Sequence, residues 1–311
     1  MFRRGVNAMS QPQLPDFVAP MLAKSSAPFD SDEFQFEVKW DGTRALAYID
    51  QHRIRLMNRR RFDITDRYPE LQCLQSLPAG TVLDGEIVVL DAEGKADFPA
   101  LQSREQARSP LKIQTLSQAS PVTYLVFDQL YQQFASLMHR PLYDRRAVLE
   151  NTITHLDESA PVFVSQAILG VGTTLFETVV AQEMEGVMAK RLSSRYEPGK
   201  RSDAWLKIKR SQQLVCVIFG YVPKQDDFES LILAAEVAGQ LRYVGRVGSG
   251  IDFRLRGQLN QTLRTLHTSS PLLKCKAKGQ WVEPRLYCKV RFMELTSGLE
   301  MRAPVFVELL E

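Results

Sequence analysis

Lys39 is the side chain in this sequence whose surroundings best suit covalent chemistry. It ends the apolar stretch of residues 36–38 and is followed by a turn at residues 41–42 and by Arg44. Apolar neighbours disfavour a charged ammonium and so favour a nucleophilic amine, and the planar guanidinium of Arg44 suits phosphate. These residues predict a lysine nucleophile beside a phosphate. A solvated turn between two strands is the structural alternative.

Carboxylates in apolar surroundings form a second group of candidate functional residues. Glu86 lies within the apolar run of residues 81–90, and Glu185 begins a Glu-Gly-x-x-x-Lys element that ends at Lys190. A carboxylate that is buried without a partner is costly. Glu86 is therefore better explained as a ligand of a metal, of a ribose hydroxyl or of an arginine than as a core residue. Glu185, taken alone, indicates a helix end followed by a strand.

Cations and one aromatic ring complete the set. Lys207 and Lys209 alternate along a strand, so both leave the same face, and their ammonium groups repel unless an anion such as phosphate lies between them. Six arginines between residues 53 and 67, Arg59 among them, suit phosphate contact at least as well as a solvated rim. Phe127 could stack on a base, although a phenylalanine in an apolar run is more often part of the core.

The apolar pattern predicts the elements that must position these residues. Strands are expected over residues 34–50, in two parts around the turn, and over residues 52–56, 81–90, 121–128 and 205–209. Helices are expected over residues 64–77, 98–114, 142–155 and 174–182, the third with Arg145 and Arg146 on its polar side. Residues 193–203 predict a flexible surface loop.

A different pattern begins near residue 211. Short β-rich runs cover residues 214–221, 230–237, 242–247 and 286–295, with a helix over residues 252–267. Five short strands and one helix are typical of a small Greek-key barrel of the OB type. Residues 239–291 hold 11 basic residues against two acidic ones, whereas residues 1–210 hold 26 of each kind. This excess indicates a polyanionic partner such as nucleic acid, with a solvated basic face as the alternative.

The composition excludes several other classes of protein. The chain has 311 residues, 44% of them hydrophobic and 24% charged, which is enough for two domains with real cores. Its four cysteines form no CxxC pair, which argues against structural zinc and for a reducing compartment. No stretch approaches the ~20 apolar residues of a membrane span. We expect a cytoplasmic protein without a membrane partner.

In their order along the chain, these residues resemble the covalent nucleotidyltransferases, and most closely the ATP-dependent DNA ligases such as the ligase module of bacterial ligase D. The Lys-x-Asp-Gly-x-Arg signature matches residues 39–44, Asp-Gly-Glu matches residues 84–86, and Glu-Gly-x-x-x-Lys matches residues 185–190. Trp-Leu-Lys-Ile-Lys at residues 205–209 completes the set. Four motifs in family order are far more specific than any one of them.

The resemblance implies an α+β fold, with a nucleotidyltransferase (adenylation) domain of antiparallel sheets and helices followed by an OB-fold β-barrel. We expect an N-terminal extension over residues 1–15, the adenylation domain over residues 16–210 and the OB-fold domain over residues 211–311. No further DNA-binding, nuclease or polymerase domain is expected. The implied protein is a minimal DNA-repair ligase, a monomer that acts on nicked double-stranded DNA, with DNA end-binding repair proteins as further partners.

The resemblance also implies roles for the site residues. Lys39 would form a lysyl-adenylate from ATP, after which AMP moves to the 5′-phosphate of a nick and is displaced by the 3′-hydroxyl. Glu37 would contact the adenine amino group, Phe127 would stack on the adenine, and Glu86 and Glu185 would hold the ribose and magnesium or manganese. Phosphates would be held by Arg44, Arg59, Lys207 and Lys209. We expect DNA contacts from Arg246, Lys276, Lys278 and Arg302 in the basic C-terminal part.

The C-terminus departs from the family pattern. The Arg-x-Pro-x-Phe element at residues 302–306 is usually followed by an Arg-x-Asp-Lys group that orients pyrophosphate, but this chain reads Leu310-Glu311. Either basic neighbours such as Arg302 replace that group, or the sequence is truncated, or the protein adenylates slowly.

Two other functions share part of the pattern. An RNA ligase or a GTP-using capping enzyme has the same Lys-x-Asp-Gly core, but Glu37 before the lysine argues against it. A non-catalytic nick-binding protein is the other alternative, and the intact candidate residues argue against a decayed site.

Overall fold

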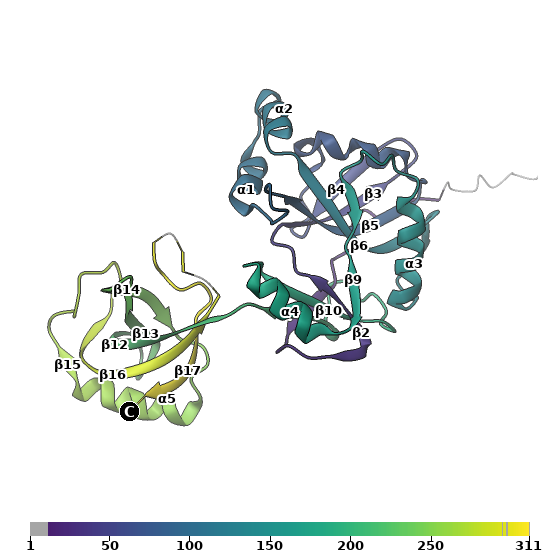
Figure 1. The fold of residues 1–311 in the computed structure, drawn as a ribbon. Helices are drawn as coiled ribbons and strands as arrows, with labels where there is room; N and C mark the ends of the chain where they lie inside the picture. Colours follow the sequence, from purple (N-terminus) through teal and green to yellow (C-terminus); the bar gives the residue numbers. More distant parts are fainter. Residues whose placement is uncertain (1–11, 294, 297, 311) are drawn as a thin grey trace, which may run out of the picture. The chain divides into compact units, whose positions relative to one another are not determined.

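The structure is a computed structural model, and it describes residues 12–293, 295–296 and 298–310. The chain divides into two compact units, Met1–Lys209 and Arg210–Glu311, which we call the N-terminal and C-terminal units (Figure 1). Among the residues that the structure describes, no helix is both long enough and apolar enough to cross a membrane.

Two separate sheets form the framework of the N-terminal unit. The first has the strand order β1-β11-β10-β2-β9, and the second has the order β4-β3-β5-β6-β7 with β8 beside β6. The strands of the first sheet are β1 (Leu22–Ser25), β2 (Ser31–Val38), β9 (Ala167–Gly170), β10 (Gly186–Arg191) and β11 (Arg201–Lys209). Those of the second are β3 (Thr43–Ile49), β4 (Ile54–Asn58), β5 (Thr81–Val89), β6 (Val122–Gln132), β7 (Ala135–Ser136) and β8 (Val162–Val164). Both sheets are antiparallel except where β1 pairs with β11 and β6 with β8.

Strands β2 and β3 form where the sequence predicts them, but they do not make a hairpin. Strand β2 pairs with β10 and β9, whereas β3 pairs with β4 and β5. The turn therefore carries the chain from one sheet to the other. Gly42 fits there because a Cβ at this position would lie 2.3 Å from the carbonyl oxygen of Ile87. Lys39 stands at this crossing, directly after β2.

Short helices cover the sheets, and two of the predicted helices differ from those in the structure. The helices of this unit are η1 (Thr65–Arg67), η2 (Pro69–Ser76), α1 (Phe98–Gln106), α2 (Pro110–Ala119), α3 (Leu142–Ile153) and α4 (Gly172–Ala181). The helix expected over residues 64–77 is wrong as an α-helix, because the chain there forms the two short 3₁₀ segments η1 and η2, the second with Pro69 at its start. The helix expected over residues 98–114 is two helices: the backbone is extended at Ala107, where α1 ends, and at Ser109, where the following Pro110 disfavours a helical conformation.

Long-range contacts overturn one further prediction and limit another. Arg145 and Arg146 do not lie on a solvated face of α3; the Arg145 side chain is fully buried and that of Arg146 is 13% exposed. The expected loop is present over residues 193–200, but its Tyr196 ring is buried, and residues 201–203 already belong to β11.

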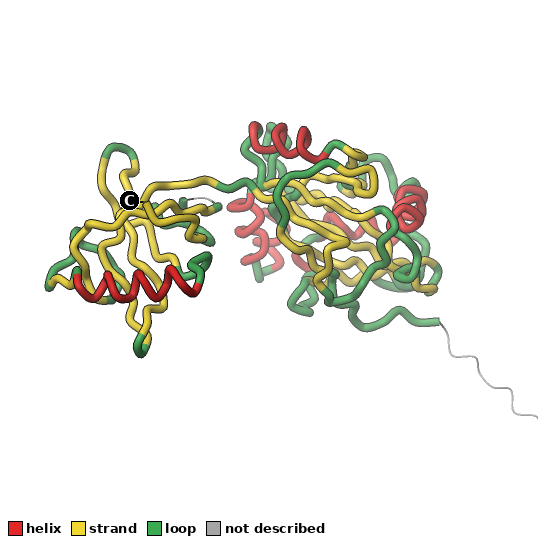
Figure 2. Tube along the Cα trace, turned by 90° about the horizontal axis from the view of Figure 1, so that it is seen from below, coloured by secondary structure: helices red, strands yellow, loops and turns green. Residues whose placement is uncertain are grey.

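The C-terminal unit is the OB-fold barrel that the sequence predicts, with longer strands. Its elements are β12 (Gln212–Lys224), β13 (Asp227–Val237), β14 (Gln240–Val247), α5 (Phe253–Thr265), β15 (His267–Thr268), β16 (Gln280–Phe292) and β17 (Val305–Leu310). The strand order is β14-β13-β12-β16-β15, with β17 beside β16. The described residues thus give six strands instead of five. Helix α5 runs along one side of these strands in Figure 2.

Apolar side chains cover both faces of this sheet. The larger cluster includes Leu259 and Leu263 of α5. The smaller cluster includes Phe219 and Trp281, and Leu273, Cys275 and Ala277 pack against it. These three alternate with exposed lysines at positions 274, 276 and 278. We call residues 273–278 the basic strap, because one side is anchored on the sheet while the other presents only lysines.

Candidate active site

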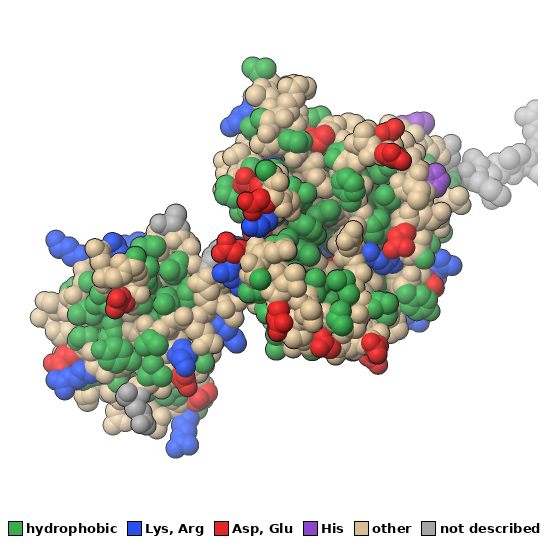
Figure 3. Space-filling view, viewed as in Figure 1, with side chains coloured by type: hydrophobic (Ala, Val, Ile, Leu, Met, Phe, Trp, Pro, Cys, Tyr) green, Lys and Arg blue, Asp and Glu red, His purple; other side chains and the backbone are tan. Residues whose placement is uncertain are grey.

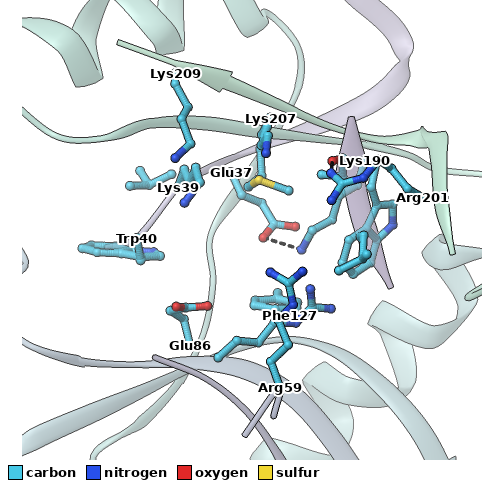
Figure 4. Close-up of a pocket in the computed structure, with 16 residues that line it drawn as sticks. Glu37, Lys39, Trp40, Arg59, Glu86, Phe127, Lys190, Arg201, Lys207 and Lys209 are labelled. Atoms are coloured by element: carbon cyan, nitrogen blue, oxygen red, sulfur yellow. Dashed lines mark hydrogen bonds and ion pairs between the residues drawn. The ribbon is translucent and has the colours of Figure 1, made fainter. Parts of the chain in front are cut away.

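A pocket lies in the N-terminal unit, with walls from both sheets (Figure 4). In Figure 4, Lys39, Lys207 and Lys209 lie on one side, and Glu86 and Arg59 lie on the opposite side. The lining residues are Leu22, Ala23, Glu37, Val38, Lys39, Trp40, Arg44, Arg59, Glu86, Phe127, Met188, Lys190, Arg201, Trp205, Lys207 and Lys209. The structure thus brings together every residue for which the sequence predicted nucleotide binding. Glu185 does not line the pocket but contacts two of its lysines.

Glu185 bridges two lysines at one end of the pocket. Lys39 Nζ donates to Glu185 Oε2 at 2.5 Å, and Lys209 Nζ lies 2.7 Å from Glu185 Oε1. The Lys39 side chain is 21% exposed and paired with a carboxylate, so it is not in the purely apolar surroundings that the sequence suggested. Gly186 fixes the position of Glu185: its φ is +147°, and a Cβ there would lie 2.1 Å from the carbonyl oxygen of Ile208.

Arg44 is held by the protein itself. Its Nε and Nη2 donate to the two carboxylate oxygens of buried Asp84 at 2.9 and 2.6 Å, and its Nη1 donates to the Met21 carbonyl at 2.6 Å. The Tyr196 hydroxyl donates to the same carboxylate at 2.7 Å. The guanidinium is therefore not the open fork for phosphate that the sequence suggested. Its Cζ lies 5.4 Å from the Phe127 ring centroid, beside the pocket.

Glu86 is a partly buried carboxylate among cations. Burial raises its pKa to about 8, against the opposing influence of Lys39 and Arg44. Lys207 shows the complementary effect: burial, and then the neighbouring charges of Lys209 and Arg201, lower its pKa. Several cations crowded on one side of a site attract an anion to it.

The other end of the pocket contains a buried ion pair. Glu37 is 2% exposed, and its Oε2 accepts a hydrogen bond from Lys190 Nζ at 2.9 Å. Gln35 Nε2 donates to Glu37 Oε1 at 2.7 Å. Lys190 Nζ also lies 3.9 Å from the Phe127 ring centroid, and burial lowers the pKa of this lysine, partly offset by Glu37. A carboxylate, an ammonium and an aromatic face thus meet at one place.

Several lining residues had no predicted role. Lys190 ends the third sequence motif and Trp205 begins the fourth, so the motifs contained them without indicating their contacts. Trp40 directly follows the lysine. Leu22, Ala23 and Arg201 come together because β1 pairs with β11, a pairing across about 180 residues that local patterns do not reveal.

The donor set fits a magnesium-type ion. Of the described residues, no three His, Cys, Asp or Glu side chains gather at one point. Glu86 and Glu185 are close enough to influence one another electrostatically. Two carboxylates suit a cation that keeps several waters and binds substrate phosphates, which is the usual coordination of magnesium.

The predicted DNA-binding residues lie in the C-terminal unit, and three of them meet. Arg246, Lys276 and Lys278 line a shallow surface depression, which we call the basic depression. Lys276 Nζ lies 2.6 Å from Glu300 Oε1. Arg302 is exposed but does not line it. Figure 3 shows lysines and arginines around the edge of the visible face of this unit, with hydrophobic side chains between them.

A lysine-edged pocket between two antiparallel sheets, in a chain that continues into an OB-fold unit, defines the nucleotidyltransferase class. The family model described as "ATP dependent DNA ligase domain" matches residues 20–209, and the one described as "ATP dependent DNA ligase C terminal region" matches residues 224–311. The chain belongs to the ATP-dependent DNA ligase family.

Relatives with known names agree with this assignment. The chain is 34% identical over 301 residues to the multifunctional non-homologous end joining DNA repair protein LigD of Mycobacterium tuberculosis, covering 92% of this chain and 38% of that protein. It is 34% identical over 319 residues to LigD of Pseudomonas aeruginosa, covering 98% of this chain and 36% of that one. The chain therefore spans just over a third of the length of these relatives.

Solved structures agree as well. The crystal structure of the ligase domain from M. tuberculosis LigD matches with a TM-score of 0.57 and 32% identity, covering 95% of both chains. The structure of mycobacterial DNA ligase D complexed with ATP and MES matches with a TM-score of 0.56 and 32% identity, again over 95% of both. The resemblance and the fold class that the motifs predicted are confirmed.

Proposed function

We propose that this chain seals nicks in double-stranded DNA, with Lys39 as the residue that carries AMP. The observation that supports this most directly is the position of Lys39, at the edge of the pocket and hydrogen-bonded to Glu185. A lysine nucleophile needs a partner that orients its amine and a nearby group of cations for the phosphates. Glu185 supplies the first, and Lys207 and Lys209 supply the second.

In the first step, Lys39 Nζ attacks the α-phosphorus of ATP. A nitrogen–phosphorus bond forms, the bond from the α-phosphorus to the bridging oxygen breaks, pyrophosphate leaves, and Nζ gives up a proton. The AMP then passes to the 5′-phosphate of a nick, which frees Lys39, and the 3′-hydroxyl displaces AMP to form the phosphodiester. Such transfers depend on positioning and charge neutralisation, which Lys207, Lys209 and Arg59 would provide.

The rest of the pocket would bind the nucleoside. Phe127 offers a ring face to the base, and Glu37 offers a carboxylate to the adenine amino group. Glu86 would accept from a ribose hydroxyl. Arg44, whose donors are engaged with Asp84 and Met21, would support the ring of Phe127 and add positive charge near the phosphates.

Glu86 and Glu185 would also hold a divalent metal ion, magnesium or manganese. When bound, such an ion neutralises phosphate charge and orients the leaving group. Because Glu185 already bridges Lys39 and Lys209, its carboxylate is shared among several cations.

The C-terminal unit would contact DNA through the basic depression, with Arg302 as a separate exposed contact. The basic strap keeps Lys274, Lys276 and Lys278 on its outer side, a spacing that suits successive backbone phosphates. We further propose that the protein acts as a monomer in the cytoplasm and in DNA repair, with DNA end-binding proteins as partners. The names of the LigD relatives support the repair role.

Incubation with α-labelled ATP or GTP and magnesium, followed by a denaturing gel, tests the proposal. We expect label from ATP on the wild-type protein and on Lys95→Ala, which removes an exposed lysine of the same unit, but none on Lys39→Ala. Label retained on Lys39→Ala would remove the nucleophile. Label from GTP alone would favour a capping-type enzyme, and no label on an intact protein would favour a non-catalytic nick-binding protein.

A further inference from the structure

Helix α3 carries two neighbouring arginines that both point into the protein, although the helix contributes no residue to the pocket lining. Adjacent positions on a helix diverge by about 100°, so the two side chains reach different targets. Arg145 reaches strand β6 of the second sheet. Arg146 reaches strand β2 of the first.

Arg145 fixes the strand that carries Phe127. Its Nε and Nη2 donate to the carboxylate of Asp128 at 2.8 and 2.7 Å, and its Nη1 donates to the carbonyls of Arg140 and Ser194. Both members of the ion pair are fully buried. Asp128 directly follows Phe127, so this pair holds the aromatic wall of the pocket in place.

Arg146 approaches the polar wall of the same pocket. Its Nη1 lies 3.6 Å from Glu37 Oε1, is buried, and makes no hydrogen bond. Its other nitrogens are engaged, with Nη2 donating to the Ser165 carbonyl at 2.5 Å and Nε to Glu150 at 3.1 Å. The guanidinium is thus anchored from behind while one nitrogen faces the carboxylate.

We propose that Arg146 is a positioning residue that holds Glu37 in the orientation in which it selects adenine. The proposal rests on the proposed role of Glu37 at the adenine amino group. Lys190, Gln35 and Arg146 approach the Glu37 carboxylate from within the protein, and a carboxylate has about four acceptor positions. These three side chains therefore fix the direction in which the remaining acceptor position of the Glu37 carboxylate points.

This arrangement explains how the pocket would distinguish bases. A fixed carboxylate acceptor matches the 6-amino group of adenine, whereas the 6-carbonyl of guanine would place two acceptors against each other. A site that is built to hydrogen-bond its ligand strongly rejects a ligand without the matching group, because its buried polar atoms are then left unpaired; an apolar site discriminates far less. If Arg146 is removed, Glu37 keeps Lys190 and Gln35 but loses the cation that restrains Oε1, and the selection should weaken.

The test compares ATP with purine riboside triphosphate, which lacks the 6-amino group, in self-adenylation assays on the full chain. We expect Arg146→Gln to lower the preference for ATP, expressed as the ratio of kcat/KM values, by about tenfold, because the interaction at stake is one hydrogen bond from the adenine amino group to the charged Glu37 carboxylate. The loss should lie mainly in KM for ATP. Glu150→Gln is the matched control, since it removes the exposed partner of Arg146 and leaves the Glu37 contact.

A purely structural role for Arg146 would slow both triphosphates equally, and an unchanged ratio would overturn the proposal. Arg146→Lys keeps the charge but cannot span both Glu37 and Ser165, so its ratio should lie between those of the wild type and Arg146→Gln. If Arg146→Gln does not fold, Arg146→Lys decides alone: a reduced ratio supports the proposal, and a wild-type ratio overturns it.

Glu37→Leu, whose side chain has no acceptor atom, separates this proposal from the one on which it rests. If Glu37→Leu loses the preference for ATP while the Arg146 variants keep it, Glu37 reads the base without help from Arg146, and only the present proposal fails. If Glu37→Leu keeps the preference, Glu37 does not read the base and both fail. Neither result bears on Lys39, whose labelling is measured separately.

Discussion

At the scale of single residues, Glu86 and Glu185 combine a burial cost with a position beside Lys39, the proposed nucleophile. Neither carboxylate is needed to complete a hydrophobic core, since both lie among cations at the pocket. We expect Glu86→Ala and Glu185→Ala each to lower nick sealing by about 100-fold or more, the range seen when a group that stabilises transferring charge is removed. The melting temperature should not fall, because removing Glu86 also relieves the cost of burying its charge. Calorimetry measures this beside Glu93→Ala, an exposed control. Folding losses that track the activity losses would make the carboxylates structural.

The raised pKa of Glu86 gives a second residue-scale prediction. The folded protein binds the Glu86 proton more tightly than the unfolded chain does, because the pKa rises from 4.5 to about 8 on folding. Stability from this group is therefore fully present below pH 4.5 and is lost as the pH rises through about 8, by at most about 1.4 kcal/mol for each pH unit.

Denaturant unfolding in metal-free buffer between pH 5 and 8 measures this effect. The free energy of unfolding should decline less steeply with rising pH in Glu86→Gln than in the wild type, and Glu86→Gln should be the more stable of the two near pH 8. Parallel pH profiles for the two proteins would show that Glu86 is ionised throughout this range.

The sequence predicted which residues share the pocket better than it predicted their partners. Lys39, Glu37, Glu86 and Phe127 line one pocket, as the residue types and the order of the motifs suggested, and their roles there remain predictions. The sequence did not predict that Asp84 and Tyr196 would hydrogen-bond to the Arg44 guanidinium. Local patterns could not show these contacts, because they join positions 40 and 152 residues apart. Local patterns indicate which side chains are unusual, whereas the fold decides which of them meet.

At the scale of elements, the ion pair of Arg145 and Asp128 joins α3 to β6 of the second sheet, and its contribution to stability can be measured. Burial raises the pKa of Asp128 while Arg145 opposes that shift, so each charge depends on the other. Asp128→Ala should destabilise the protein by roughly 3–5 kcal/mol, because it leaves a buried guanidinium unpaired. Glu33→Ala, which breaks an exposed pair with Arg191, should cost at most about 1 kcal/mol. Equal midpoints for the two variants in urea unfolding would contradict this account.

Strands were easier to predict than helices in this chain. Strands β5, β6 and β11 contain long apolar or alternating runs and form where the sequence predicts them; the bounds of β5 lie close to those expected, whereas β6 ends four residues later and β11 begins four residues earlier. The helical segments are short, and Pro69 and Pro110 interrupt them at places where the apolar spacing alone suggests continuity. Local patterns could not predict that β2 pairs with β9 and β10, because the sequence of a β-strand does not identify its neighbours in the sheet.

At the scale of the whole molecule, the two units have separate cores. Every residue of the clusters around Leu56, Trp205 and Phe36 precedes residue 210, and every residue of the clusters around Phe228 and Phe219 follows it. A chain that ends at Arg210 should therefore keep a cooperative thermal transition while losing most of its affinity for nicked DNA. Full-length efficiency of this shortened chain on pre-adenylylated nicks, with unchanged salt dependence, would show that the C-terminal unit is not the DNA clamp.

The basic depression makes a prediction about salt. Charge reversal of Arg246, Lys276 and Lys278 should weaken binding to nicked duplexes of any sequence alike, because backbone contacts carry no base information. The slope of log affinity against log salt should become shallower by about 0.9 for each phosphate that the protein no longer neutralises. A control with the same change in net charge reverses three exposed arginines elsewhere in this unit: Arg254, Arg264 and Arg285. Equal effects from both triple variants in titrations would show that net charge alone matters.

The place of β2 in its sheet also determines how late in synthesis this strand can acquire its neighbours. Both neighbours of β2 come late in the chain: β9 at residues 167–170 and β10 at residues 186–191. A ribosome that adds about 5–20 residues per second needs roughly 8 to 30 s to proceed from Val38 to Arg191. Strands β3, β4 and β5 can pair with one another well before that, while β2 still lacks both of its neighbouring strands. The strand that leads to Lys39 thus acquires its hydrogen-bonded neighbours only after most of the N-terminal unit has been synthesised.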